Sequence, residues 1–205
     1  MSIFDYPKNP HMREHGPRGY RDYRNYKPWL RDEFSFRCVY CLCRERWYPN
    51  GQDGFSVDHF LPKTKFPQLE CDYENLLYAC VKCNTLKTDC ELDCDPCRES
   101  FSIHLEVKGD GRVHGRTSTG GKLIDVLILD RPKLRRLRNM LMTVLPVLER
   151  SKRPEDIAML RFWLGFPTDL PDLRRKRPPG GNSKPSGVKT CYFCQQASGL
   201  LPEFY

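Results

Sequence analysis

Two pairs of cysteines with zinc-ligand spacing enclose most of the residues in this chain that could do chemistry. Cys38 and Cys41 form one C-x-x-C pair, and Cys80 and Cys83 form another. Two residues between thiolates allow both sulfurs to reach one tetrahedral ion at about 2.3 Å. We therefore expect one structural zinc ion bound by all four sulfurs.

Polar residues that suit a second, catalytic metal ion lie between and just after these pairs. Asp58 precedes His59 in V-D-H-F-L-P, and Asn84 directly follows Cys83. Imidazole titrates near neutrality, so His59 can act as a general base. Asp58 and Asn84 are oxygen donors of the kind that Mg²⁺ or Mn²⁺ prefers. Asn75 can hydrogen-bond the loop that holds His59, and the set as a whole has the groups that phosphodiester hydrolysis requires.

Three lysines are candidates for contacts with a phosphate backbone. Lys63 and Lys65 lie in the loop after His59, and Lys87 lies one helical turn after Asn84. We expect these side chains to bind substrate phosphates.

The elements that must position these residues follow from local pattern. Residues 55–60 alternate like a strand that ends before Pro62, and residues 75–79 indicate a second short strand. The segment from Val81 to about Asp89 is typical of a helix that begins at the cysteine pair. Strand, loop, strand and helix make a ββα unit.

The stretch 38–87 resembles the HNH endonuclease family in its four-cysteine form. It contains C-x-x-C, D-H-x-x-P, N-L and C-x-x-C-N-x-x-K in the family's order. Many members have histidine where Asn84 stands, a departure that affects metal preference more than activity. The resemblance implies a ββα-metal fold, DNA cleavage, Asp58 and Asn84 as metal ligands, His59 as general base, Asn75 as positioning residue, and a zinc ion on Cys38, Cys41, Cys80 and Cys83.

The region after this stretch is loosely similar to HNH proteins of bacterial phage-defence systems, such as the Septu nuclease subunit. Those proteins pair with an ATPase. The resemblance implies an antiviral role and a protein partner for this chain.

Two further C-x-x-C pairs lie outside the ββα unit. They are Cys94 with Cys97, in an acidic loop, and Cys191 with Cys194, near the C-terminal end. We expect either a second zinc ion held by these four cysteines or an unpaired tail, and metal would pin the tail to the core.

The chain predicts an α+β protein with four parts. Residues 1–30 form a basic aromatic arm, which either packs on the domain or stacks on bases, and packing is favoured. Residues 31–100 form the nuclease core, and residues 101–170 add a hairpin and helices. Residues 171–205 contain a flexible basic linker and the last cysteine pair.

Patterns in the third part are more local. Residues 101–107 alternate like a strand, with Ile103 facing inward, and Gly109-Asp110-Gly111 can turn a hairpin. Asp130 can cap a helix with a leucine stripe, which Pro146 should kink or end. A second helix is expected from about Pro154 to Gly165.

Charge is distributed unevenly along the chain. The net charge is +8, yet residues 38–130 carry 11 Lys and Arg against 15 Asp and Glu, whereas residues 131–177 carry 13 against 5. An acidic centre with basic flanks fits a cation site beside surfaces that hold DNA. RNA is a less favoured substrate, and a non-catalytic zinc-stabilised adaptor is the alternative function.

The remaining features bear on location and assembly. No apolar run approaches the roughly 18 residues of a membrane span, and the N-terminal residues lack a secretory pattern. We expect a cytoplasmic protein. A single site of this kind nicks one strand, so a double-strand break requires two subunits or two events, and the oligomeric state stays open.

Overall fold

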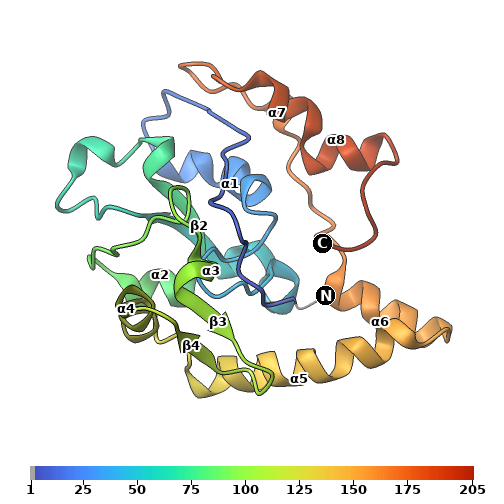
Figure 1. Ribbon diagram of the computed structural model, residues 1–205. Coiled ribbons are helices and arrows are strands. Elements are labelled where there is room, and N and C mark those ends of the chain that lie inside the picture. Colours follow the sequence, from blue (N-terminus) through green and yellow to red (C-terminus); the bar gives the residue numbers. More distant parts are fainter. Residues whose placement is uncertain (1–2) are drawn as a thin grey trace.

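The computed structural model describes residues 3–205, and a ββα unit lies at their centre (Figure 1). Strand β1 (Phe55–His59) pairs antiparallel with β2 (Leu76–Cys80), with Phe55 opposite Cys80 and His59 opposite Leu76. Helix α2 (Val81–Lys87) follows β2 directly and packs on both strands. Every residue of β2 is buried because α1 and α2 both pack against this short strand. The predicted ββα arrangement is confirmed.

The N-terminal arm packs onto this unit. Helix α1 (Lys27–Glu33) has Pro28 in its first turn, where the missing N–H costs nothing, and it contacts β2. Trp29 and Tyr26 are each only 1% exposed, and the rings of Tyr26 and Tyr20 meet edge to face at 4.9 Å. The aromatic residues of the arm therefore supply core surface, as the favoured interpretation expected.

A second small sheet follows the ββα unit. Strands β3 (Leu105–Val107) and β4 (Val113–Gly115) form the expected hairpin. The expectation of a strand over residues 101–107 is wrong in its first half, because α3 (Phe101–His104) occupies it and Ser100 caps that helix through the N–H of Ser102. The helical turn directs Ile103 outward, where its side chain is 51% exposed.

The sequence reading gave no element for residues 118–127, which form helix α4 (Ser118–Leu127). Thr117 caps it by accepting a hydrogen bond from the N–H of Gly120. A Cβ atom at Gly120 would lie 2.1 Å from the carbonyl oxygen of His104, so only glycine permits this approach of α4 to α3.

Two long helices extend from the core along the lower edge in Figure 1. Helix α5 (Pro132–Arg150) buries Leu134, Leu141 and Leu145, and α6 (Pro154–Leu164) packs against it. Pro146 does not end α5, which continues to Arg150, and this proline stands at an exposed position of the helix. Asp130 does not cap α5; Arg131 precedes the helix, and the Asp130 carboxylate accepts a hydrogen bond from the N–H of Val113.

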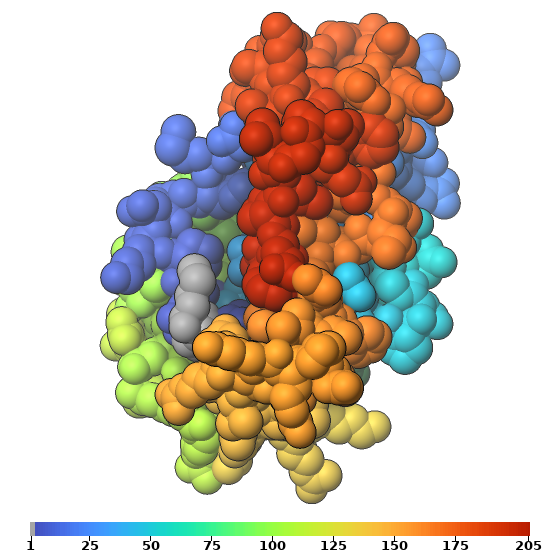
Figure 2. Space-filling model, turned by 90° about the vertical axis from the view of Figure 1, so that its right-hand side faces the viewer, coloured from blue at the N-terminus to red at the C-terminus, as the bar shows by residue number. Residues whose placement is uncertain are grey.

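The C-terminal part lies against the rest of the molecule. It contains α7 (Pro185–Thr190) and α8 (Tyr192–Ala197), and Figure 2 shows it as a red band between the blue N-terminal arm and the orange helical region. The segment 171–189, expected to be a flexible linker, is hydrogen-bonded to the arm instead. The backbone of Arg18 bonds to both Gly180 and Gly181 at 2.9 Å.

Candidate metal and catalytic site

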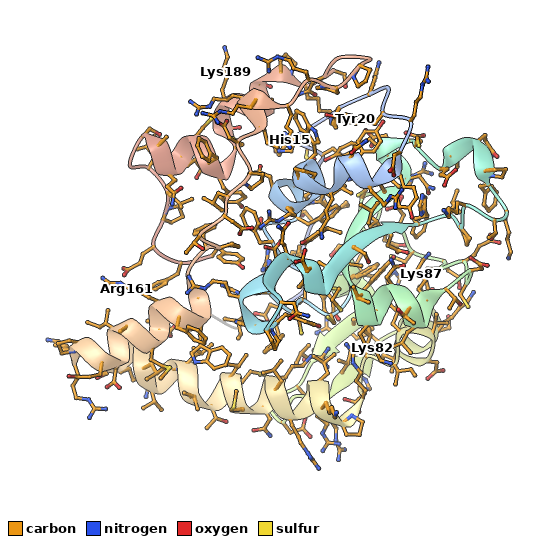
Figure 3. All side chains as sticks on the ribbon, turned by 180° about the vertical axis from the view of Figure 1, so that it is seen from behind. His15, Tyr20, Lys82, Lys87, Arg161 and Lys189 are labelled. Carbon is orange, nitrogen blue, oxygen red and sulfur yellow. The ribbon has the colours of Figure 1, made fainter. Side chains whose placement is uncertain are left out.

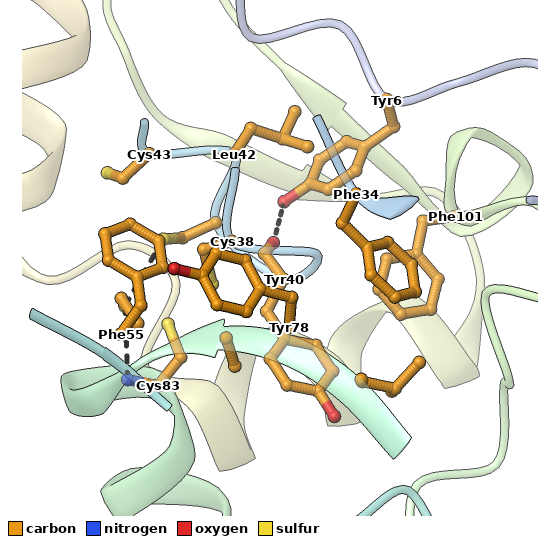
Figure 4. Close-up of a cluster of buried hydrophobic side chains, with 14 of the residues drawn as sticks. Tyr6, Phe34, Cys38, Tyr40, Leu42, Cys43, Phe55, Tyr78, Cys83 and Phe101 are labelled. Atoms are coloured by element: carbon orange, nitrogen blue, oxygen red, sulfur yellow. Dashed lines mark hydrogen bonds between the residues drawn. The ribbon is translucent and has the colours of Figure 1, made fainter. Parts of the chain in front are cut away.

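Four cysteines converge where β2 ends and α2 begins. The Sγ atoms of Cys38, Cys41, Cys80 and Cys83 lie within 4.8 Å of one another, and all four residues are buried. The sulfurs of Cys41 and Cys80 are 3.8 Å apart. A tetrahedral zinc site with bonds of about 2.3 Å has sulfurs separated by roughly 3.8 Å, so the group fits zinc. Figure 4 shows Cys38 and Cys83 packed among aromatic rings of the core.

Local backbone geometry aims these sulfurs. The N–H of Cys38 donates to the carbonyl of Cys43, and the N–H of Leu42 donates to the carbonyl of Cys38, each at 2.9 Å, with Leu42 at a positive φ of 63°. On the other side, the Cys80 sulfur caps α2 by accepting a hydrogen bond from the Cys83 N–H at 3.4 Å. The tight knuckle and the helix start thus bring both cysteine pairs to one point.

A neighbouring cation approaches the sulfur group. The guanidinium of Arg131, just before α5, lies 3.7 Å from the sulfur of Cys83. Four zinc-bound thiolates carry two negative charges in excess of the ion, and a nearby guanidinium offsets part of that charge. Sequence spacing could not have indicated Arg131, because 48 residues separate it from Cys83.

Asp58 lies inside the protein, between the zinc knuckle and α2. Its side chain is 3% exposed, and its Oδ2 atom accepts a hydrogen bond from the hydroxyl of Tyr40. The Lys87 ammonium lies 3.5 Å from Oδ1. Burial raises the pKa of Asp58, and the Lys87 charge and the Tyr40 hydroxyl act in the opposite direction.

Lys87 is not placed as a phosphate contact. Its side chain is fully buried, and its ammonium donates a hydrogen bond of 2.6 Å to the backbone carbonyl of His59. Lys82, on the same helix, is exposed (Figure 3). A buried ammonium requires a partner, and here β1 supplies both a carboxylate and a carbonyl oxygen. Lys87 therefore holds the end of β1 against α2.

Asn84 faces β1 from α2. Its Nδ2 donates to the hydroxyl of Ser56 at 2.8 Å and to the carbonyl of Val57 at 3.2 Å. The oxygen of the same amide keeps its lone pairs available for another group. Asn84 and Asp58 each carry oxygen atoms of the kind that Mg²⁺ prefers. Both oxygens of Asp58 already face a partner, which is Tyr40 for Oδ2 and Lys87 for Oδ1. A divalent ion on Asp58 would share the carboxylate with Lys87.

His59 ends β1 and is 8% exposed. Its Nε2 lies 3.0 Å from the carbonyl oxygen of Glu70, which can only accept, so Nε2 carries the proton and Nδ1 keeps a lone pair. Burial lowers the pKa of His59, although the Glu70 carbonyl acts in the opposite direction. The neutral ring with a free Nδ1 is the form that a general base requires.

Asn75 clamps the loop that follows His59. Its Oδ1 accepts from the N–H of Leu61 at 2.8 Å, and its Nδ2 donates to the Leu61 carbonyl at 3.0 Å. The backbone of Phe60 also bonds to the Asn75 carbonyl at 2.9 Å. Asn75 therefore holds the backbone of Leu61, two residues after His59, and its role in a reaction stays a prediction.

The loop lysines are accessible, as a phosphate contact requires. Lys63 is 41% exposed and pairs with Glu70 at 2.9 Å, and Lys65 is 54% exposed and pairs with Glu91 at 2.8 Å. Lys63 also lies 4.7 Å from the ring centre of Tyr23, whose ring meets that of His59 edge to face at 4.7 Å. Tyr23 from the arm thus joins Lys63 to His59.

The expected second zinc group does not assemble. Within residues 3–205, Cys94, Cys97, Cys191 and Cys194 do not form a common group of ligand atoms. The Cys194 sulfur bonds to the Val188 carbonyl at 3.2 Å, and the segment around α8 packs on Phe36 and Phe166 instead. Cys94 lies beside Glu99 and His104.

Residues 38–89 match the HNH endonuclease family. The resemblance predicted from the motifs is confirmed for this stretch, called the HNH module from here on. HNH nucleases use divalent metals, and the module contains a four-cysteine group compatible with zinc. The catalytic roles of its residues remain proposals.

The alignment with one curated relative is longer than the HNH module. The chain is 31% identical over 99 residues to the Septu protein PtuB of Bacillus thuringiensis. This alignment covers 46% of the chain and 37% of the relative, so the chain aligns with well under half of that protein. No solved structure is significantly similar to the chain. Between residues 3 and 205, no helix has the length and apolar character to cross a membrane.

The sequence did not predict two residues that contact the site, Tyr40 inside the HNH module and Tyr23 in the arm. Tyr40 is the third residue of C-V-Y-C, where any side chain is compatible with the zinc knuckle. Tyr23 belongs to an arm whose rings were expected mainly to pack. Their contacts with Asp58 and His59 depend on tertiary structure, so the sequence carries no local signal for either.

Proposed function

We propose that this protein is a metal-dependent endonuclease that hydrolyses phosphodiester bonds of DNA. The observation that supports it best is the end of β1, where a neutral His59 with a free Nδ1 adjoins Asp58, and where Asn84 faces the same strand from α2. The match of residues 38–89 to HNH endonucleases supports the same reaction class.

Each residue has a defined task in this proposal. His59 Nδ1 accepts a proton from the attacking water, while the Glu70 carbonyl fixes the ring and Asn75 fixes the loop behind it. Asp58 and Asn84 would hold Mg²⁺ or Mn²⁺, which stabilises negative charge on the phosphate and on the leaving oxygen. Lys63 and Lys65 would contact flanking phosphates.

DNA binding must draw on more than residues 38–130. Residues 38–130 carry 11 Lys and Arg against 15 Asp and Glu, so this region repels a phosphate backbone overall. We assign most of the affinity for DNA to the basic region 131–177, to the arm, or to a protein partner. The similarity to Septu PtuB supports an effector nuclease of a bacterial phage-defence system, acting in the cytoplasm with a partner such as an ATPase.

A plasmid-nicking assay tests the proposal. Wild type, His59→Ala and His114→Ala are incubated with supercoiled DNA and Mg²⁺ or Mn²⁺, with and without a candidate partner. His114 is an exposed histidine on β4, so its variant controls for loss of an imidazole elsewhere. We expect nicking by wild type and His114→Ala and at least a hundredfold loss in His59→Ala.

The assay also separates the alternative function. Asp58 is buried and already paired with Lys87, which is an arrangement that a non-catalytic, zinc-stabilised adaptor would also tolerate. Salt-sensitive DNA binding that survives in His59→Ala, together with equal absence of nicking in all three proteins under every metal and partner tried, would establish the adaptor and refute the nuclease. Competition with RNA tests the substrate class.

A further inference from the structure

A second group of metal-ligand types lies outside the HNH module. A sulfur of Cys94, a carboxylate oxygen of Glu99 and a ring nitrogen of His104 all lie within 4.8 Å of one another. Cys94 is 1% exposed and His104 is 6% exposed, while Glu99 reaches the group from the surface. The three residues come from the loop after α2 and from α3.

His104 is oriented in the manner of a metal ligand. Its Nδ1 lies 2.8 Å from the hydroxyl of Thr117, the residue that also caps α4. Histidines that bind metals usually have their second ring nitrogen held by such an oxygen, which fixes the tautomer and the direction of the ring. Thr117 thus directs Nε2 toward Cys94 and Glu99.

The Nε2 atom of His104 makes no hydrogen bond with any of the described residues. It is buried, and a Glu99 oxygen lies only 3.2 Å away. Two ligands on a tetrahedral zinc ion, at bond lengths of about 2.0 to 2.2 Å, stand roughly 3.3 Å apart. The pair is therefore spaced like two ligands of one ion, and a buried nitrogen is aimed at the place where the ion would be.

We propose that Cys94, Glu99 and His104 bind a zinc ion, with the fourth position taken by water. Sulfur, nitrogen and carboxylate oxygen together favour a borderline transition-metal ion over Mg²⁺ or Ca²⁺, which prefer oxygen alone. The Cys94 sulfur makes only a weak contact, at 3.6 Å, with the Glu99 carbonyl, so a small rotation is enough for it to bind metal.

The site would fasten the loop after the HNH module to the elements that follow it. Cys94 lies in that loop, His104 ends α3, and Thr117 caps α4. The same loop binds the N-terminal arm through the carbonyl of Pro96, which accepts a hydrogen bond of 2.8 Å from the N–H of His11. Zinc at Cys94 therefore stabilises the contact between the arm and the body of the protein.

Metal analysis of the full chain, purified under reducing conditions, tests the site against the pairing first expected from sequence. Wild type should contain two zinc ions per chain. Cys94→Ser and His104→Gln should contain one, and Cys191→Ser should retain two, because Cys191 lies outside the proposed site. Glu99→Gln should retain its fold, since Glu99 is exposed, and should lose its second zinc to a chelator at least tenfold more readily than wild type.

The outcomes are distinct. One zinc in wild type, or two in His104→Gln, overturns the proposal. One zinc in Cys191→Ser with two in His104→Gln restores the site formed by the two outer cysteine pairs. Far-UV circular dichroism and retention of the first zinc show that the variants are folded. Cobalt substitution adds a check, because Cys94→Ser should lose part of the sulfur-to-cobalt absorption and leave the four-sulfur spectrum intact.

Discussion

The hydroxyl of Tyr40 donates a hydrogen bond to the buried carboxylate of Asp58. Tyr40 lies between Cys38 and Cys41 of the four-cysteine group, and Asp58 precedes His59, the proposed general base. The zinc site and the proposed catalytic metal ligand are therefore connected by a single hydrogen bond. A zinc ion on the four cysteines would fix the turn from Cys38 to Cys41, and that turn holds Asp58 through Tyr40.

This connection predicts that Tyr40→Phe impairs catalysis without loss of zinc. The variant leaves one buried carboxylate oxygen without its donor, which costs about 1 to 3 kcal/mol. We expect a lower melting temperature, unchanged zinc content and nicking at least tenfold slower than wild type. Tyr78→Phe is a matched control, because it removes a similar hydrogen bond to the buried Glu45, away from Asp58. Equal effects of the two variants on nicking would contradict the prediction.

Lys87→Met should reveal whether a divalent ion binds Asp58. The variant leaves the carboxylate buried without its counter-charge, a change that typically costs 3 to about 5 kcal/mol. A divalent ion would supply the missing charge. We therefore expect Mg²⁺ or Mn²⁺ to raise the melting temperature of Lys87→Met more than that of wild type.

Lys82→Met serves as the control for this experiment, because Lys82 lies on the same helix but is exposed. Its melting temperature should respond to divalent ions as wild type does. If Lys87→Met gains no more than Lys82→Met from either ion, Asp58 is not a metal ligand.

Asn75 offers a test of loop positioning. Asn75→Ala removes both hydrogen bonds to Leu61, whereas Asn75→Asp keeps the acceptor for the Leu61 N–H and loses the donor. We expect nicking to fall in the order wild type, Asn75→Asp, Asn75→Ala. Asn182→Ala, which loses comparable bonds to the Gly16 and Lys184 N–H groups, should lose stability alone. A nicking rate unchanged in Asn75→Ala would show that the clamp does not serve His59.

Glu33 should make folding stability depend on pH. Burial acts to raise its pKa, but hydrogen bonds from His11 and from the N–H of Glu14 lower it below the usual 4.5. A carboxyl group whose pKa is lower in the folded than in the unfolded protein stabilises the fold at any pH above its unfolded-state pKa. This stabilisation is lost as the pH falls from about 4.5 through the lower pKa of the folded state.

Urea denaturation of wild type and Glu33→Gln between pH 3 and 7 measures this contribution. The stability difference should be largest near neutrality and should shrink as the solution is acidified below about pH 4.5. Glu155→Gln, at an exposed position of α6, should show a small difference that does not vary in this way. A difference in the free energy of unfolding between wild type and Glu33→Gln that stays constant from pH 3 to 7 would show that Glu33 does not make stability depend on pH.

Local spacing predicted the zinc knuckle, the HNH motif and the ββα order because each depends on neighbours within a few residues. The burial of Lys87 could not be predicted in this way, because it depends on the Asp58 carboxylate and the His59 carbonyl of β1. The outer cysteine pairs show the same limit. Their spacing suits zinc, yet the fold places Cys94 beside His104 rather than beside Cys191.

The helices and strands differ from those predicted from sequence at places where one capping residue or one exposed position determines the local structure. Ser100 turns the alternating residues 101–104 into a helical turn. Gly120 reads as a loop residue, but in α4 it permits contact with the backbone of His104. Pro146 stands inside α5 at an exposed position, where its ring does not have to fit into the core.

The hydrogen bonds between Arg18 and Gly180–Gly181 have a consequence for the order of folding. They join residues more than 160 positions apart, as does the bond of 2.9 Å from the Gly16 N–H to Asn182, at a separation of 166. Contacts of such high sequence separation form late, since loop closure must be paid before they stabilise anything. During synthesis these bonds of residues 16–18 cannot form until residue 182 has left the ribosome. A growing chain thus has its four-cysteine group and its HNH motif long before residues 16–18 are bonded to residues 180–182.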